Sequence, residues 1–177
     1  MDGLTVALGG AGATIGLLLC SAFFSSSETA IFSLSPDWID QQATAGDRRA
    51  GVLKELRDDP HRLLVTLLVG NNVVNVAISS IVTVLIASYL PPGPAVAVTT
   101  VVTSVLILIF GEIVPKAYGL GNAKRWSLTI AAPVRFVERA LSPLITLFDG
   151  ITRRINLLIS ADPEIEKPLS EATDRDG

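Results

Sequence analysis

Residues 63–110, LLVTLLVGNNVVNVAISSIVTVLIASYLPPGPAVAVTTVVTSVLILIF, contain no charged side chain. A helix rises about 1.5 Å per residue, so about 20 apolar residues cross the hydrocarbon core of a bilayer, and this stretch is too long for one crossing. The run PPGP at 91–94 interrupts it, because proline cannot continue a helix and glycine favours a turn. The pattern predicts a helical hairpin in a membrane, with spans at about 63–90 and 95–115.

A further span precedes this hairpin. Residues 4–27 are also uncharged and are long enough to cross a bilayer. A cleaved signal peptide fits less well, because the stretch has no basic start, is too long for the apolar part of such a peptide, and has no small-residue cleavage site before the polar SSSE. We therefore expect three spans.

The composition favours the same class of protein. Apolar residues make up 49% of the chain and charged residues only 18%, compared with roughly 25% charged residues in soluble domains. The net charge of −3 gives no sign of a nucleic-acid partner. Cys20 is the single cysteine and His61 the single histidine, so neither a disulfide framework nor a zinc site is expected. The fold class predicted is an all-α integral membrane protein.

Two amphipathic regions flank the second and third spans, at 36–60 and 122–159. In the later one, Arg135, Glu138 and Arg139 interrupt any further crossing, while apolar side chains recur at helical spacing. This pattern predicts interfacial helices that lie along the membrane surface. Residues 1–160 together are then expected to form one transmembrane domain.

The basic residues predict how the domain is oriented. All fourteen lysines and arginines lie either between the first two spans or from Lys116 onward, and none lies near the N-terminus or in PPGP. The positive-inside rule then places the N-terminus and PPGP outside, and residues 35–62 and the C-terminal third in the cytoplasm. The predicted location is the cell (plasma or inner) membrane, with several crossings.

Polar residues inside the spans need an explanation, because an unpaired polar group in hydrocarbon is costly. Ser21 and Ser25 lie four residues apart and share one helix face, and Asn71 and Asn75 repeat that spacing on the second span. Glu112 lies near the end of the third span. Counting residues along each span places these groups at a similar depth, in the cytoplasmic half of the membrane.

Pro115 adds a backbone oxygen to this set. It has no amide hydrogen, so in a helix the carbonyl of Gly111, four residues earlier, loses its usual donor. That carbonyl, the Glu112 carboxylate, and the serine and asparagine oxygens are suitable ligands for a hard cation such as Mg²⁺. One carboxylate, with Glu28 as a candidate second, indicates a partly hydrated ion rather than a permanent structural metal.

Each residue also has a purely structural explanation. Serine often bonds back to its own helix and allows close packing, and asparagine often bridges helices. Glu112 has Lys116 one turn along as an ion-pair partner, and Pro115 alone accounts for a kink. Residues and spacing by themselves leave the cation site and the packing explanation both open.

Three stretches carry a more specific signal: SAFFSSSETAIFSLS at 21–35, LLVTLLVGNNVVN at 63–75 and FGEIVPKAYG at 110–119. In text, order and spacing they resemble the CorC/CNNM family of magnesium transporters, the cyclin M-like proteins. The resemblance covers about residues 4–160, and the Gly-Glu-Ile-Val-Pro run at the end of a membrane helix is its most specific part.

The resemblance implies a homodimeric membrane domain with three spans per subunit and a belt of short helices on the cytoplasmic side. It also implies one partly dehydrated Mg²⁺ per subunit, held in an inward-facing cavity lined by oxygens. The ligands that the motifs imply are Ser21, Ser25, Asn71, Gly111 (through its carbonyl) and Glu112, with Ser26, Glu28, Asn72 and Asn75 as second-tier candidates and Pro115 as a structural residue.

Members of the family usually continue into paired CBS domains that bind ATP-Mg²⁺. The acidic tail at 161–177 is therefore expected to begin a linker toward such cytoplasmic regulatory domains. No nucleotide site is expected within this chain. The expected partners are a second copy of the chain, the lipid bilayer and the protein's own cytoplasmic domains.

The leading functional hypothesis is Mg²⁺ export from the cytoplasm through the inward-facing cavity. The alternative is a non-transporting Mg²⁺ sensor or scaffold that signals through cytoplasmic domains, because binding and transport use the same ligands. An enzyme is not expected, since no G-x-S-x-G, H-E-x-x-H or Ser–His pairing occurs within the spans.

Overall fold

The computed structural model describes residues 3–159, which lie in helices and short turns and contain no strand. The chain divides into two compact units, Met1–Leu141 and Ser142–Gly177. The first unit contains all the candidate site residues. The linker predicted at 161–177 lies outside the described residues.

Three helical runs within the described residues are long and apolar enough to cross a membrane: Thr5–Phe32, Pro60–Ala87 and Pro92–Gly121. Many of their large apolar side chains are exposed, among them Val101, Leu108 and Phe110, which suits contact with lipid. The predicted all-α membrane fold with three spans is confirmed.

The first span, α1, is longer than the uncharged stretch suggested and runs over Gly3–Phe32. It continues through the polar SSSE, where two of the three serine hydroxyls bond back to their own helix. Those of Ser26 and Ser27 donate to the carbonyl of Phe23 at 3.2 and 2.6 Å. Such bonds let a polar run remain helical in an apolar environment.

The second span, α4, covers Pro60–Ala87 and begins three residues earlier than the apolar pattern indicated. The Asp59 side chain caps it by accepting a hydrogen bond of 3.0 Å from the amide of Arg62. Pro60 fits the first turn, where an amide hydrogen would have no helical partner.

The PPGP turn is shorter than expected. Helix α5 (Pro92–Leu106) already begins within it, and Pro91 is the residue before the first helical position. Proline is tolerated in the first turn of a helix, because amide hydrogens there have no partner within the helix. Pro92 and Pro94 therefore start the third span instead of ending the turn.

The third span contains a π-helical turn. After α5 the chain forms η1 (Ile107–Ile113), in which the amide of Val114 donates to the carbonyl of Ile109, five residues back, and then α6 (Val114–Gly121). Pro115 sits at the start of α6 and supplies no amide hydrogen to the preceding turn. Single π turns of this kind occur mostly within helices at functional positions.

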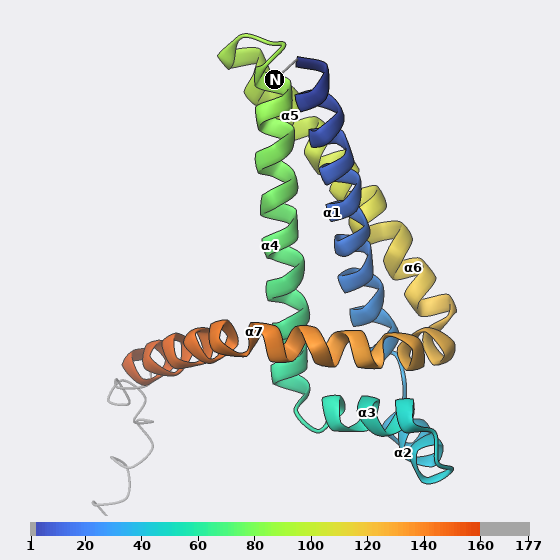
Figure 1. The fold of residues 1–177 in the computed structure, drawn as a ribbon. Helices are drawn as coiled ribbons and strands as arrows, with labels where there is room; N and C mark the ends of the chain where they lie inside the picture. Colours follow the sequence, from blue (N-terminus) through green and yellow to red (C-terminus); the bar gives the residue numbers. More distant parts are fainter. Residues whose placement is uncertain (1–2, 160–177) are drawn as a thin grey trace, which may run out of the picture. The chain divides into compact units, whose positions relative to one another are not determined.

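Helix α1 packs against α4, η1 and α6, while α4 also packs against α5 (Figure 1). Glycines permit the close approaches. Gly70 of α4 leaves room for the ring of Phe24, and Gly119 of α6 leaves room for the backbone of Ser26. These contacts set the rotation of α4 and α6 about their axes relative to α1.

Three helices lie at the end of the bundle where α1 stops and α4 begins: α2 (Pro36–Thr44), α3 (Arg48–Arg57) and the first part of α7 (Ala123–Ile159) (Figure 1). We call α2, α3 and residues 123–141 of α7 the belt. Buried apolar residues join it to the ends of the spans: Ile39, Leu53, Leu56, Leu63, Ile130 and Val134. That the belt lies along a membrane surface stays a prediction.

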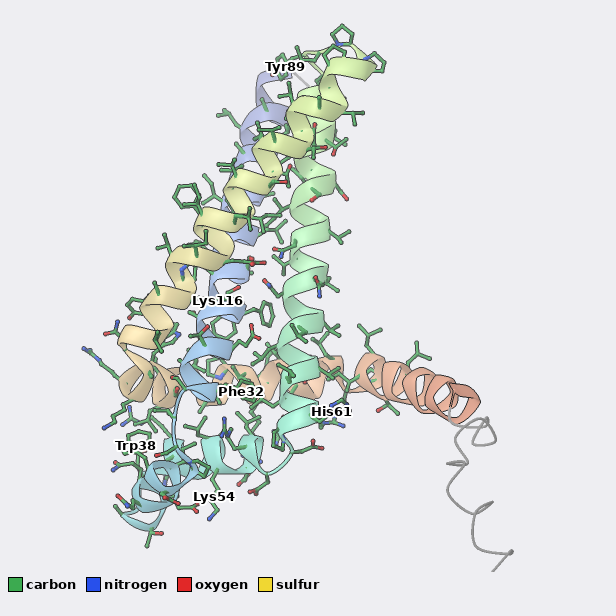
Figure 2. The ribbon with its side chains drawn as sticks, turned by 180° about the vertical axis from the view of Figure 1, so that it is seen from behind. Phe32, Trp38, Lys54, His61, Tyr89 and Lys116 are labelled. Atoms are coloured by element: carbon green, nitrogen blue, oxygen red, sulfur yellow. The ribbon has the colours of Figure 1, made fainter. Side chains whose placement is uncertain are left out.

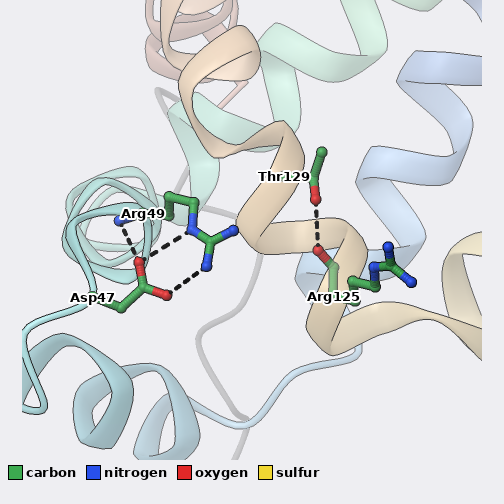
Figure 3. A network of polar contacts seen from close by, with 4 residues as sticks. All are labelled: Asp47, Arg49, Arg125 and Thr129. Atoms are coloured by element: carbon green, nitrogen blue, oxygen red, sulfur yellow. Dashed lines mark hydrogen bonds and ion pairs between the residues drawn. The ribbon is translucent and has the colours of Figure 1, made fainter.

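The junction between α2 and α3 is a tight turn at Gly46, whose φ of 91° favours glycine. Asp47 then caps α3 by accepting hydrogen bonds from the amide and the guanidinium of Arg49 (Figure 3). The guanidinium hydrogen bond, with the backbone bond second, lowers the pKa of Asp47. The predicted region 36–60 thus consists of two helices.

Ion pairs connect the elements of the belt. Arg62 at the start of α4 lies 2.6 Å from Glu138 of α7, and Arg135 of α7 lies 2.7 Å from Glu55 of α3. Lys54 pairs with Asp40 at 2.7 Å, and its hydrogen bond to that carboxylate raises the pKa of the lysine. These pairs link α2 to α3, and α7 to both α3 and α4.

Candidate cation site

The site is built around Ser21, whose side chain is fully buried on α1. Its Oγ lies 2.9 Å from Oδ1 of Asn71 and 2.8 Å from Oδ1 of Asn75. The two asparagines stand one turn apart on α4, so both reach the same hydroxyl. Three side-chain oxygens from two spans therefore meet at one point.

With the amide oxygens of Asn71 and Asn75 both facing Ser21, one hydroxyl proton is shared between two acceptors. The Ser21 hydroxyl carries one proton and can donate to only one amide oxygen at a time, which leaves the other oxygen at contact distance without a hydrogen bond. Either a cation among the three oxygens or rotation of one amide to present its NH₂ group removes this conflict. The structure therefore brings a hydroxyl and two amides together, and both a cation and a rotated amide are compatible with this arrangement.

Gly111 brings the third span to the same point. It is buried in η1, and a Cβ atom on it would lie 2.7 Å from Oγ of Ser21. The backbone of the π turn is therefore packed directly against this hydroxyl. Pro115 cannot donate a hydrogen bond to the Gly111 carbonyl, as the sequence indicated.

Ser25 lies one turn below Ser21 on the same face of α1. Its side chain is 1% exposed, and its Oγ has no hydrogen-bond partner within the described residues. Leaving a buried hydroxyl unsatisfied costs about 1–3 kcal/mol. The neighbouring hydroxyls of Ser26 and Ser27 do have partners, so among these three serines only Ser25 lacks a hydrogen bond within residues 3–159.

Glu112 follows Gly111 in the π turn and is half-buried. The structure gives its carboxylate no hydrogen bond or ion pair with any residue of 3–159. The sequence-based alternative, a Glu112–Lys116 pair, is not formed, because Lys116 lies 3.6 Å from Glu28 instead. Figure 2 shows Lys116 on the third span, toward the end of the bundle where Phe32 ends α1.

Two second-tier candidates are occupied by other contacts. Glu28 pairs with Lys116. Ser26 accepts a hydrogen bond of 3.1 Å from the indole nitrogen of Trp126 and so ties α1 to the belt. The structure gives neither residue a contact with Ser21, Asn71 or Asn75.

The two remaining second-tier asparagines differ from each other. Asn72 is exposed and is not in contact with Ser21, whereas Asn75 is as close to Ser21 as Asn71 is. The i, i+4 spacing of 71 and 75 already placed both on one face. That spacing was the signal that could have ranked Asn75 with Asn71.

The groups that the structure brings together here are one hydroxyl and two amides, with the backbone of Gly111 packed against the hydroxyl. Among the described residues, no group of three or more His, Cys, Asp or Glu side chains could hold a metal ion. Hydroxyl, amide and backbone oxygens are ligands that suit a hard cation.

Comparison with known proteins identifies a similar family. The profile of the cyclin M transmembrane N-terminal domain matches residues 12–173, which is most of the chain. The match includes all three stretches that carry the resemblance to the CorC/CNNM proteins.

Curated proteins from plants and bacteria are also similar. The chain is 36% identical over 128 residues to a chloroplastic DUF21 domain-containing protein of Arabidopsis thaliana, covering 72% of this chain and 19% of that protein. It is 31% identical over 149 residues to the UPF0053 inner membrane protein YfjD of Escherichia coli, covering 82% and 34%. A UPF0053 protein of Synechocystis sp. is 32% identical over 136 residues, covering 77% and 39%. The chain thus spans between about a fifth and two fifths of the length of these relatives.

Proposed function

The chain belongs to the family of cyclin M transmembrane domains, and from this premise we propose that it moves Mg²⁺ across the membrane through the site at Ser21. The family is of the membrane-transporter type and is not an enzyme family. The observation that carries the proposal is the Ser21 hydroxyl, which faces two amide oxygens at 2.8–2.9 Å with one proton to share.

Each ligand has its own part in this proposal. Ser21, Asn71 and Asn75 supply neutral oxygens, and the Gly111 carbonyl supplies a backbone oxygen. Glu112 supplies the negative charge, and the unpaired hydroxyl of Ser25 supports a further contact one turn below. Mg²⁺ loses its water reluctantly, so the ion keeps part of its hydration shell.

The direction that we propose is export. The basic residues favour a cytoplasmic belt and an external PPGP turn, so the site opens toward the cytoplasm near the belt and releases the ion outside. A second copy of the chain completes a homodimer in the cell membrane. The E. coli relative is named an inner membrane protein.

The decisive experiment measures Mg²⁺ flux in liposomes that contain only this purified protein. Wild type is compared with Glu112→Ala and with Glu28→Ala, which removes the carboxylate paired with Lys116. We expect Glu112→Ala to abolish flux and Glu28→Ala to retain most of it. Wild-type flux in Glu112→Ala refutes the role of this carboxylate.

The same liposomes separate transport from sensing. A sensor binds Mg²⁺ but moves none when it is the only protein present. Binding measured by calorimetry without any flux in the wild type would refute the transporter and favour the sensor.

A further inference from the structure

Asn72 exposes its amide on the surface of the second span. It belongs to α4, and its side chain is exposed, whereas Asn71 and Asn75 are partly buried and contact Ser21. Within residues 3–159 the Asn72 amide makes no hydrogen bond. An amide carries two donor hydrogens and an acceptor oxygen, and the described part of the chain satisfies none of them.

The amide lies near the middle of the span. Helix α4 covers Pro60–Ala87, which corresponds to a length of about 42 Å, and Asn72 lies about 18 Å from its start. The hydrocarbon core of a bilayer is about 30 Å thick, so lipid headgroups do not reach this depth. An amide in hydrocarbon without a hydrogen bond is costly. Asn72 therefore requires a polar partner within the membrane.

Its own helix does not supply that partner. The hydroxyls of Ser79, Ser80 and Thr83, further along α4, donate to the carbonyls four residues earlier. Such bonds satisfy a serine or threonine within its own helix. Asn72 makes no bond of this kind, and one such bond would leave its remaining hydrogen and its oxygen unmet. The partner has to come from another element.

Asn72 belongs to a row of residues with the spacing of a helix–helix contact. Val69, Asn72, Val76, Ser79 and Thr83 follow one another at intervals of three and four residues, the seven-residue repeat by which two helices pack side by side. None of the five is buried within the described residues, and all but Val69 line an open depression of about 560 Å³. We call these five residues the open stripe.

Another face of the same helix is already covered. Leu63, Leu67, Gly70 and Ile78 of α4 are buried, and Gly70 lies against the ring of Phe24 in α1. Helix α4 packs on α1 and α5 within its own chain. The open stripe thus has the spacing of a packed face, but the described part of the chain leaves it uncovered.

A second copy of the chain fits this stripe. Two copies inserted in the same orientation present Asn72 at the same depth, so their amides can meet across a two-fold axis along the membrane normal. Each amide then donates one hydrogen to the oxygen of the other, which satisfies both. The small side chain of Ser79 allows the two helices to approach closely. An unrelated helix would need its own polar group at that depth.

We propose that the open stripe pairs with the open stripe of a second copy, with hydrogen bonds between the two Asn72 amides. A single asparagine in such a contact fixes the register of the helices and the number of chains. The inference rests on the homodimer of the proposed function and adds the face and the residue that hold it together.

The first test measures the association of Asn72→Leu in lipid. Leucine has a similar volume and removes the amide. Proteins labelled with donor or acceptor dyes are reconstituted in liposomes at decreasing protein-to-lipid ratios, and energy transfer reports the dimer fraction. We expect the dissociation constant to rise about tenfold, as the loss of an amide contact between membrane helices predicts. Asn72→Gln, which keeps an amide, should restore most of the association. An unchanged constant in Asn72→Leu overturns the proposal.

Asn71→Leu is the matched control. It removes the neighbouring amide, which contacts Ser21 of its own chain and does not line the depression. We expect its dissociation constant to stay within about twofold of wild type. A loss of association as large as in Asn72→Leu would mean that leucine disturbs α4 in general, and would overturn the specific role of Asn72. Normal association of Asn72→Leu with a lower Mg²⁺ affinity would make Asn72 a ligand and overturn the pairing.

The second test locates the contact by cross-linking in a Cys20→Ser background. Val76→Cys lies in the open stripe, and Ile15→Cys lies on α1. The two native side chains are similarly exposed, at 66% and 61%, and both lie about 17–18 Å from the PPGP-side end of their helix. Copper phenanthroline oxidises two thiols that meet to a disulfide. We expect a disulfide-linked dimer of Val76→Cys in liposomes and none of Ile15→Cys. The reverse result, or no cross-link at either position, overturns this face.

These outcomes separate the pairing from the function on which it rests. Wild-type protein that stays monomeric in liposomes overturns the pairing and the homodimer together. A wild-type dimer that Asn72→Leu does not weaken overturns the pairing alone. The Mg²⁺ flux of the same liposomes is measured separately, so a failure of transport is distinguished from a failure of association.

Discussion

The Ser21 hydroxyl is the point at which all three spans meet. It contacts Asn71 and Asn75 of α4, and the backbone at Gly111 of η1 is packed against it. The Ser21 hydroxyl has one proton for the two amide oxygens, and one turn below it the hydroxyl of Ser25 has no hydrogen-bond partner among residues 3–159. At the scale of single residues, the groups that the proposed cation would bind are therefore the oxygens around Ser21 and the hydroxyl of Ser25.

Removing the unsatisfied hydroxyl of Ser25 should affect two quantities in opposite directions: the stability of the protein without Mg²⁺ and the stabilisation that Mg²⁺ adds. In Ser25→Ala we expect the free energy of unfolding without Mg²⁺ to stay equal or to rise by up to about 1–3 kcal/mol, because an unmet hydroxyl is removed. The stabilisation that Mg²⁺ adds should become smaller. Thermal unfolding in detergent, with and without Mg²⁺, measures both quantities.

Ser27→Ala is the matched control, because the Ser27 hydroxyl has a partner in Phe23. It should lose about 1 kcal/mol without Mg²⁺ and keep the wild-type response to the ion. If Ser25→Ala and Ser27→Ala behave alike, Ser25 has no role in binding.

Gly111→Ala tests the close approach of the π turn. The added Cβ would lie 2.7 Å from Oγ of Ser21, so the hydroxyl or the turn must move. We expect Mg²⁺ affinity to fall about tenfold or more, since a displacement of one ligand costs at least about 1.4 kcal/mol. Calorimetric titration of the purified protein with Mg²⁺ measures this affinity.

Gly16→Ala provides the comparison, since nothing lies within 4 Å of a Cβ at that position. It should leave affinity unchanged and add up to about 1 kcal/mol of stability from helix propensity. Equal affinities for Gly111→Ala and wild type would contradict the placement of this backbone in the site.

At the scale of elements, the third span differs most from a regular helix. Its π turn, Ile107–Ile113, precedes Pro115 and brings Gly111 against α1. Below the turn, α6 packs on α1 with Gly119 against the backbone of Ser26. Two glycines eight residues apart, one within the π turn and one in α6, thus allow the third span to pack closely against the first.

The close contact between α1 and α6 predicts how a substitution at Gly119 changes the stability of the protein. Gly119→Ala would place a Cβ in collision with the carbonyl oxygen of Ser26, which is backbone and moves only with its helix. We expect a loss of about 1–3 kcal/mol in the free energy of unfolding. Gly121→Ala, where a Cβ meets nothing within 4 Å, should change it by less than about 0.5 kcal/mol. Denaturation in mixed micelles measures both, and equal stabilities would contradict the packing.

At the scale of the whole molecule, the spans and the belt carry different kinds of contact. The spans meet through glycines, hydroxyls and amides, whereas the belt is joined by ion pairs such as Arg62–Glu138 and Arg135–Glu55. Ion pairs of this kind need water or headgroups nearby to solvate their charges. This division agrees with the proposed placement of the belt at the membrane surface.

The proposed orientation predicts which residues an external reagent reaches. Figure 2 shows Tyr89 near the PPGP end of the bundle and Lys54 at the belt end. In a Cys20→Ser background, Ser88→Cys should react with an impermeant maleimide added to intact cells, and Asp40→Cys only after the membrane is opened. Labelling of Asp40→Cys in intact cells, with Ser88→Cys labelled only in opened ones, would contradict the proposed orientation and with it the proposed direction of transport.

Sequence alone determined the three spans, because hydropathy and helical period are local properties that lipid enforces on any chain. It also indicated which polar residues were out of place, since Ser21, Asn71 and Glu112 are costly in hydrocarbon wherever they point. The ends of the helices were predicted less accurately. They depend on single local features, such as the hydrogen bond by which Asp59 caps α4 and the position of Pro92 in the first turn of α5.

Only the tertiary structure decided which of the nine candidate site residues lie together. It brought Asn75 to Ser21, paired Ser26 with Trp126 and Glu28 with Lys116, and gave Ser25 no hydrogen-bond partner among residues 3–159. Such choices depend on the rotation of each helix about its axis and on its vertical register. Glycine contacts between spans fix both, at Gly70, Gly111 and Gly119, and no local pattern in the chain encodes which neighbour each glycine meets.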